Sequence, residues 1–293
     1  MHGYVGREDP VLTVAMSVLN GGEYLQLAVR SIVEQTFNGW ELLILDDGST
    51  DGAIEKLTDL KDPRIIVIRD GFNKGLSSRL NQAINRARGR YFARMDHDDV
   101  CHPERFAVQL DYLEAHLQVD LLATKCVTLN EKDQLVDALP FASNHELICA
   151  RPWLGFPMPH PSWMGRTAWF RRHYYQDPAP YCCEDNELLL RAYKSSVYHA
   201  IEQDLLAYRV RTHVPWSKMW KTRKAMGLVQ INYFCRAKDW RYAFLACAVT
   251  LIRVARDVRS ELIYRIGLTQ SDISLRGECA DDGWIEWIEK LRR

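Results

Sequence analysis

The sequence lacks the features that mark several large classes of protein. Its eight cysteines form no CxxC pair and no regular series of spacings, which argues against a disulfide framework or zinc site and favours reduced thiols. The longest apolar stretch, 242–252, is too short to cross a bilayer of about 30 Å. Residues 1–10 contain no apolar core of a signal peptide. We therefore expect a cytoplasmic protein.

The sequence also has no excess of either charge, no internal repeat and no low-complexity segment. Lysine plus arginine number 38, as do aspartate plus glutamate, so the net charge is +0 and we expect no nucleic-acid partner. The chain has 293 residues, of which 47% are hydrophobic and 26% charged, as in an ordinary globular protein. This length suits one large domain, or a catalytic domain with a smaller appendix.

Strand-like and helical patterns alternate through the first half of the chain. The expected strands are 12–19, 40–45, 65–68 and 91–95, and the expected helices are 23–35, 51–60, 76–88 and about 103–117. This alternation predicts an α/β fold with a mostly parallel sheet flanked by helices. In such sheets, ligands bind beyond the carboxyl ends of the strands.

The patterns after residue 120 are less regular. We expect strands at 121–128 and 165–170, with a loop at 151–161 because four prolines interrupt that segment. The apolar spacing at 188–192 predicts a helix, which places Asp185 near a helix N-terminus.

Basic and aromatic residues dominate from about Trp216 to Arg265, and this pattern predicts two amphipathic helices. They contact anionic lipids and a lipid-linked acceptor through 216–266, or form a helical cap on the catalytic domain, and the two interpretations are compatible. We therefore expect a catalytic domain at 1–215, with halves at about 10–120 and 121–215, and a helical C-terminal extension at 216–293.

Two acidic clusters close expected strands, LDDGSTD at 45–51 and RMDHDD at 94–99. Carboxylates at strand ends are costly to bury without partners. Hard divalent cations prefer carboxylate oxygens and share them with phosphates, so the two clusters predict a shared site for a metal and a nucleotide diphosphate. The alternative is that both are ordinary turns, since Asp-Gly-Ser-Thr-Asp is favourable turn chemistry.

Several motifs together carry a family resemblance. LTVAMSVLN at 12–20, AVRSIVEQTF at 28–37, ELLILDDGSTD at 41–51, NKGL at 73–76 and YFARMDHDD at 91–99 occur in this order and resemble family 2 glycosyltransferases. The similarity covers roughly 12–211. It implies a GT-A fold of Rossmann type, and transfer of a sugar from a nucleotide donor with inversion at the anomeric carbon. The QxxRW signature of processive synthases is absent, which favours the addition of one sugar per event.

The resemblance also implies roles on the donor side. Asp47 would hydrogen-bond the nucleotide base, with Asp46 beside it, and Ser17 and Leu19 would line the nucleotide pocket. Lys74 either approaches the diphosphate or is a solvated loop residue.

The second acidic cluster resembles the family's DxD motif. Asp98 would bind a Mn²⁺ or Mg²⁺ ion that bridges the two phosphates, and Asp96 would lie near the ribose or the metal. Asp98 or Asp99 serving as a helix N-cap is the alternative. Asp185 resembles the family's catalytic base, and Glu184 is its main competitor.

Four further residues are candidates for the acceptor or phosphate side. Arg209 falls in the late segment that closes over the phosphates in the family, and His160 and His213 are candidates to line the pocket. Trp163 either stacks on a sugar or packs in the core.

The resemblance therefore implies an inverting, non-processive glycosyltransferase that uses a UDP-sugar and a glycan or lipid-linked acceptor. A sugar nucleotidyltransferase would need a basic, glycine-rich phosphate loop, but NGGE at 20–23 contains no lysine or arginine. A sugar-nucleotide or glycan-binding protein on a degenerate scaffold would not need Asp98 and Asp185, which are both present.

Overall fold

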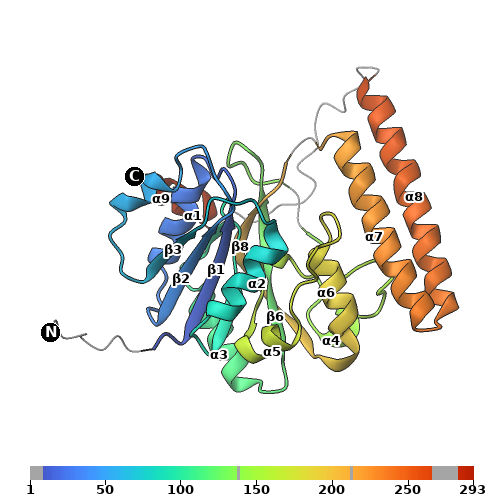
Figure 1. The fold of residues 1–293 in the computed structure, drawn as a ribbon, viewed down its shortest axis with the longest axis horizontal. Helices are drawn as coiled ribbons and strands as arrows, with labels where there is room; N and C mark the ends of the chain where they lie inside the picture. The colour runs from blue at the N-terminus through green and yellow to red at the C-terminus, as the bar shows by residue number, and fades with distance from the viewer. Residues whose placement is uncertain (1–8, 137–138, 212–213, 266–282) are drawn as a thin grey trace.

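The computed structural model describes residues 9–136, 139–211, 214–265 and 283–293. An eight-stranded sheet with strand order β3-β2-β1-β4-β7-β6-β8-β5 runs through the described residues (Figure 1). The strands are β1 (Leu12–Val18), β2 (Trp40–Asp46), β3 (Ile65–Arg69), β4 (Tyr91–Arg94), β5 (Val100–Cys101), β6 (Leu121–Leu129), β7 (Met164–Arg166) and β8 (Tyr198–Arg209).

The first four strands are parallel, whereas β7 runs antiparallel to both β4 and β6. All residues of β2, and all but Ser17 of β1, are buried, as expected for parallel strands that are covered on both faces. The prediction of an α/β fold with a mostly parallel sheet is confirmed in this half.

Helices cover both faces of the sheet. The helical segments before the C-terminal region are α1 (Tyr24–Val33), η1 (Glu55–Asp59), α2 (Leu76–Arg86), α3 (Arg105–Ala115), α4 (His145–Ile148), η2 (His160–Ser162), α5 (Thr167–Arg172), α6 (Glu184–Ala192) and η3 (Tyr193–Ser195). Apolar residues of α1 and α3 join one core cluster with alternate residues of β1. Residues of α2, α5 and α6 form the cluster on the opposite face.

Two predicted elements differ from the structure. The expected helix at 51–60 is only the short 3₁₀ segment η1, and the expected strand at 165–170 is wrong beyond Arg166. There the chain enters α5, because Trp169 and Phe170 are buried side by side rather than on alternate faces. The Thr167 hydroxyl donates to the Gly89 carbonyl at 2.6 Å and ties the start of α5 to the segment before β4.

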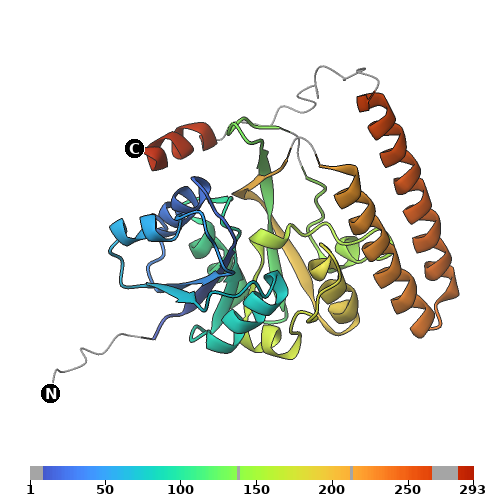
Figure 2. The same cartoon turned by 45° about the horizontal axis from the view of Figure 1, so that its top comes forward.

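The C-terminal region forms a helical hairpin at one side of the sheet, made of α7 (Trp216–Arg236) and α8 (Trp240–Arg265) (Figures 1 and 2). Phe234 of α7 packs with Ala243 and Ala246 of α8 and with Leu190 of α6. The predicted helical C-terminal region is therefore confirmed. Within the described residues, no helix combines the length and apolar character needed to span a bilayer.

The last helix, α9 (Trp284–Arg292), lies apart from the hairpin and against α1 (Figure 2). Its Trp284 and Ile288 pack with Leu27 of α1, and Arg30 donates from Nη1 to the Leu291 carbonyl at 2.8 Å. The end of the chain therefore returns to the first half of the sheet, rather than extending the hairpin.

Candidate active site

The two acidic clusters meet at the carboxyl ends of the parallel strands. Asp46 is the last residue of β2, and Asp96 follows the end of β4 by two positions. The Asp47 amide donates to the Val18 carbonyl at 2.7 Å, and the His97 ring nitrogen Nδ1 lies 3.3 Å from the Ser17 carbonyl. The end of β1 therefore holds both clusters at one edge of the sheet.

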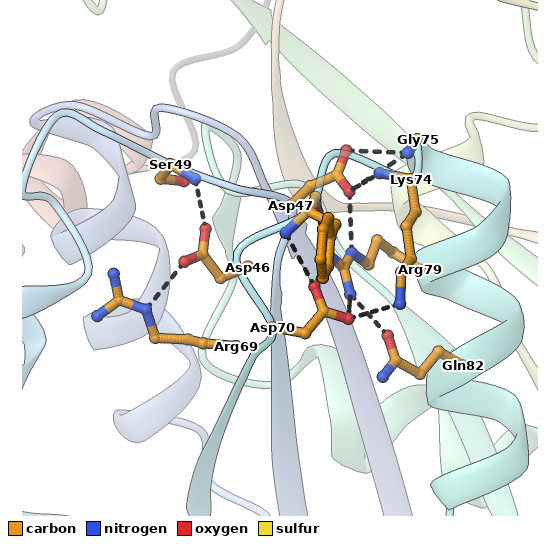
Figure 3. Close-up of polar contacts among 10 residues, drawn as sticks. Asp46, Asp47, Ser49, Arg69, Asp70, Lys74, Gly75, Arg79 and Gln82 are labelled. Atoms are coloured by element: carbon orange, nitrogen blue, oxygen red, sulfur yellow. Dashed lines mark hydrogen bonds and ion pairs between the residues drawn. The ribbon is translucent and has the colours of Figure 1, made fainter.

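Asp47 is at the centre of a hydrogen-bonded group that joins β2 to α2 (Figure 3). Its carboxylate accepts from the amides of Lys74 at 2.7 Å and Gly75 at 3.0 Å, and from Arg79 Nε at 2.9 Å. The Arg79 side chain is fully buried, and its two terminal nitrogens donate to the Asp70 carboxylate at 3.0 and 2.7 Å. The pKa of Asp70 is lowered because Arg79, Lys74 and the Phe72 amide donate to its carboxylate.

The other residues predicted for nucleotide binding lie around this group. Asp46 is buried and accepts from the Ser49 amide at 2.8 Å and from Arg69 Nε at 3.0 Å. The Lys74 ammonium donates to Asp70 at 2.6 Å, and Leu19 is exposed at the end of β1. Arg79 was missed in the sequence, because one arginine in an amphipathic helix is normally a solvated residue.

Asp96, Asp98 and Asp99 form the second cluster. One carboxylate oxygen from each lies within 4.8 Å of those of the other two. Asp99 is buried; its Oδ1 accepts from the Arg209 amide at 2.8 Å, and its Oδ2 has no hydrogen-bond partner within the described parts of the chain. Burial, followed by the charges of Asp96 and Asp98, raises the pKa of Asp99 well above its usual value.

This donor set fits a divalent cation. Three carboxylates repel one another at this separation, and hard cations such as Mg²⁺ and Mn²⁺ prefer oxygen ligands. The unpartnered, buried Asp99 oxygen is the kind of group that a cation would satisfy. Asp99 is an additional candidate ligand, and β5 separates it from the start of α3.

Arg94 is close to two acidic groups. One is the candidate metal cluster of Asp96, Asp98 and Asp99, and the other is a second pair of acids. Its guanidinium is buried and donates to Asp96. Its charge also acts on Glu184 and Tyr175. The Arg94 nitrogens Nε and Nη1 are buried without a hydrogen-bond partner in the described structure. A single buried cation therefore serves acids that come from two distant parts of the sequence.

Glu184 and Asp185 form the second acidic pair, at the N-terminus of α6. Burial, followed by the charge of Asp185, raises the pKa of Glu184 to about 7. Burial also raises the pKa of Asp185, whose Oδ1 accepts from the Asn186 amide at 2.7 Å. His160 Nδ1 lies 3.8 Å from Glu184, but burial lowers the pKa of His160 well below its usual value, so this contact involves a neutral imidazole.

The remaining predicted residues have different surroundings. Trp163 is fully buried and donates to the Met158 carbonyl at 3.2 Å, so it packs in the core. His160 is held by Tyr175, whose hydroxyl lies 2.7 Å from Nε2. His213 lies outside the described residues.

Arg209 lines a cavity beside the metal cluster and also makes contacts within the protein, whereas its Nη2 is buried without a hydrogen-bond partner among the described residues. It donates from Nε to the Asp98 carbonyl at 2.9 Å and from Nη1 to the Asn130 carbonyl at 2.8 Å. It also forms an ion pair with Asp133 at 2.6 Å. Arg209 therefore braces the loop that carries the metal cluster.

The cavity beside the metal cluster has a volume of about 660 Å³. Asp96, Asp98, Arg211 and Lys218 are among the residues that line it. Lys218 belongs to the first turn of α7, so the helical hairpin begins at the wall of this cavity. The cavity combines anionic and cationic walls, as a site for a metal-bound diphosphate requires.

Comparison with known proteins identifies the family of this chain. Residues 13–174 match the family described as "Glycosyl transferase family 2". The chain is 33% identical over 125 residues to "Putative glycosyltransferase EpsE" of Bacillus subtilis, with 42% of this chain and 45% of that protein covered. It is 28% identical over 106 residues to the Escherichia coli "UDP-Glc:alpha-D-GlcNAc-diphosphoundecaprenol beta-1,3-glucosyltransferase WfgD", with 36% of this chain and 42% of that protein covered. The chain thus spans less than half the length of these curated relatives.

The fold is similar to that of TarS from S. aureus. The crystal structure of TarS 1–349 in complex with UDP-GlcNAc gives a TM-score of 0.59 at 17% identity, over 75% of this chain and 65% of that chain. Similarity at this identity shows the fold alone, and it confirms the GT-A-like α/β architecture. With the family match covering more than half of its residues, the chain belongs to glycosyl transferase family 2.

Proposed function

We propose that this protein is an inverting, metal-dependent glycosyltransferase that adds a single sugar from a nucleotide diphosphate sugar to a glycan or lipid-linked acceptor. The observation that carries the proposal is the pairing of two acidic groups around Arg94. Asp96 with Asp98 and Asp99 forms one group, and Glu184 with Asp185 forms the other. Glycosyl transfer requires two such functions, one at the leaving diphosphate and one at the acceptor hydroxyl.

The metal cluster serves the donor side of the reaction. Asp98 and Asp99, with Asp96 beside them, would hold a Mn²⁺ or Mg²⁺ ion. When bound, the ion neutralises the charge that develops on the leaving diphosphate. Arg211 and Lys218 line the same cavity and add positive charge where the phosphates are expected.

The second acidic pair serves the acceptor side. Asp185 takes the proton from the acceptor hydroxyl, whose oxygen forms the new bond to the anomeric carbon as the bond to the diphosphate breaks. Attack opposite the leaving group inverts the configuration. A raised carboxylate pKa suits this role, because a general base is most effective when its pKa lies near the working pH. Glu184 stands beside Asp185 and is the alternative base.

Donor and acceptor classes come from the relatives. The TarS structure contains UDP-GlcNAc, and the name of WfgD specifies a UDP-glucose donor and a diphosphoundecaprenol acceptor. We extend both classes to this chain, with Asp47, Asp46, Ser17 and Leu19 on the base side of the donor and Lys74 near the diphosphate. The proposed catalytic domain is 1–215 and the proposed extension is 216–293. We also propose a cytoplasmic location, and a lipid-linked acceptor would bring the protein to the inner face of a membrane.

The test is a panel of UDP-, GDP- and dTDP-sugars with Mn²⁺, Mg²⁺ or EDTA, read as nucleotide diphosphate release with and without acceptor lipid. We expect metal-dependent turnover of one donor, lost in Asp98→Ala and in Asp185→Asn. Asp111→Asn, on the exposed side of α3, is the matched control and should retain turnover. Calorimetry separates a missing acceptor from a wrong site. UDP with Mn²⁺ should bind to wild type and to Asp185→Asn, and absence of binding to wild type would overturn the proposal.

A further inference from the structure

The outer face of α8 carries a continuous row of exposed apolar side chains. Trp240, Phe244, Leu251 and Leu262 each expose between 57% and 73% of their surface, and Val258 completes the row. Their spacings of four and seven residues place them on one side of a helix. Isolated exposed apolar residues are ordinary, but a row along a helix of 26 residues, about 39 Å long, is an interaction surface.

This row faces away from the rest of the residues that the structure describes. On the opposite side of α8, Ala243 and Ala246 are buried against Phe234 of α7. Asp257 on that side pairs with Arg223 of α7 at 2.7 Å. Figures 1 and 2 both show α7 between α8 and the sheet, so α8 is the outermost element on this side. The row is therefore not needed to hold the hairpin together.

One edge of the row is basic. Arg241, Arg256 and Arg259 are exposed, and Arg241 and Arg259 each follow an apolar member of the row by one position. The acidic residues of α8 are Asp257, which is buried, and Glu261, which is half-buried. A second copy of the same face would bring arginines together without exposed carboxylates to meet them. An anionic lipid surface complements both the apolar row and the basic edge.

The hairpin also connects this face to the candidate active site. Lys218, in the first turn of α7, lines the cavity that contains Asp96 and Asp98. In Figure 1 the start of α7 and the carboxyl ends of β1 and β2 lie toward the same, upper end of the molecule. A membrane bound along α8 would therefore contact the same helical hairpin whose first turn lines the cavity.

We propose that the outer face of α8 lies in the surface of an anionic membrane, with its apolar row in the headgroup region and its arginines on lipid phosphates. The idea that this contact delivers a lipid-linked acceptor rests on the proposed function, whereas the contact itself does not. The occupant is the lipid surface, and a second copy of the chain is the alternative that the experiment must distinguish.

The experiment is sedimentation of the full chain with vesicles of phosphatidylcholine, with or without phosphatidylglycerol, and without any donor. We expect binding to the phosphatidylglycerol vesicles only, weakened by salt. The double variant Phe244→Ser/Leu251→Ser should bind at least about tenfold more weakly, because it removes two side chains from the apolar row. Changing Arg241, Arg256 and Arg259 together to Gln should weaken binding about fivefold per arginine.

Leu117→Ser is the matched control, because Leu117 is 71% exposed but lies beyond the end of α3. It should bind vesicles like wild type. Equal binding by wild type and the double variant would overturn the proposal, as would no binding by wild type. So would a wild-type dimer in sedimentation velocity that Phe244→Ser/Leu251→Ser dissociates, since a second copy would then occupy the face. Donor turnover is measured separately, so a wild-type protein that turns over the donor but does not bind vesicles refutes the membrane contact alone.

Discussion

The buried Arg79 guanidinium donates from Nε to the Asp47 carboxylate at 2.9 Å and thereby ties α2 to the end of β2. The same guanidinium donates twice to Asp70, so one cation holds the loop at 70–75 against the candidate nucleotide site (Figure 3). The amides of Lys74 and Gly75 in that loop also donate to Asp47. The first acidic cluster is therefore a structural centre of the site, and not only an exposed turn.

Replacing Arg79 by Met is expected to destabilise the protein by about 3–5 kcal/mol, because Asp47 would be left buried without its partner. Denaturant unfolding measures this change. Lys74→Met is the matched control, because Lys74 also pairs with Asp70 but is 44% exposed. Loss of this surface pair should cost about 0–1 kcal/mol. An equal loss of unfolding free energy in the two variants would show that the buried Arg79–Asp47 pair contributes no more than a surface pair.

Asp99→Asn is expected to separate metal binding from folding. The Asn side-chain oxygen can still accept from the Arg209 amide, and one of three mutually repelling carboxylates is removed. In EDTA the variant should therefore be at least as stable as wild type. Saturating Mn²⁺ should stabilise wild type, by about 3 kcal/mol at a hundred times its dissociation constant, and should not stabilise the variant.

The measurement for Asp99→Asn is thermal unfolding with and without Mn²⁺. Asp204→Asn, a carboxylate of β8 that pairs with Lys125 at 3.4 Å, serves as the control and should keep the stabilisation by Mn²⁺. A Mn²⁺ response in Asp99→Asn equal to that of wild type would place the ion elsewhere.

Glu184 gives stability a defined pH dependence. Its pKa is about 7 in the folded protein against an ordinary 4.5, so the folded state holds this proton more tightly than the unfolded chain. The resulting stabilisation is complete below about pH 4.5 and is lost as the pH rises through 7. Glu184→Gln cannot ionise, so its stability relative to wild type should rise over this range by about 1–3 kcal/mol. Denaturant unfolding in EDTA at several pH values tests this, and parallel curves would refute it.

The sequence was most informative where an apolar run ends in turn chemistry. The bounds of β1, β2, β3 and β4 differ from the predicted strands by at most one residue, because each is such a run, although β3 is only partly buried. The strand β8 was not predicted. Its polar segment at 202–204 lies where the pairing with β6 shifts register, which breaks the alternation that marks a strand.

The candidate site was likewise predicted only in part. The acidic residues were identified because consecutive carboxylates at strand ends are unusual, and Asp96 and Asp98 do lie in one cluster. Arg79 and Arg94 were not identified as partners, because nothing in a one-dimensional pattern distinguishes a buried arginine from a solvated one. The partner of each becomes visible only when α2, β4 and α6 are assembled around the sheet.

Arg94 provides the sharpest test of how the two acidic groups are linked. Its buried guanidinium donates to Asp96, and its charge favours the ionised form of Glu184. Arg94→Met should therefore destabilise the protein by about 3–5 kcal/mol, because Asp96 loses its partner. It should also raise the pKa of Glu184, so that the pH dependence of stability moves to higher pH.

Arg166→Met is the matched control, since Arg166 donates to the backbone carbonyls of Val119 and Leu113, and not to carboxylates. That control should lower stability without moving the pH dependence. If the two variants shift the pH dependence equally, the charge of Arg94 does not act on Glu184, and the two acidic groups are independent.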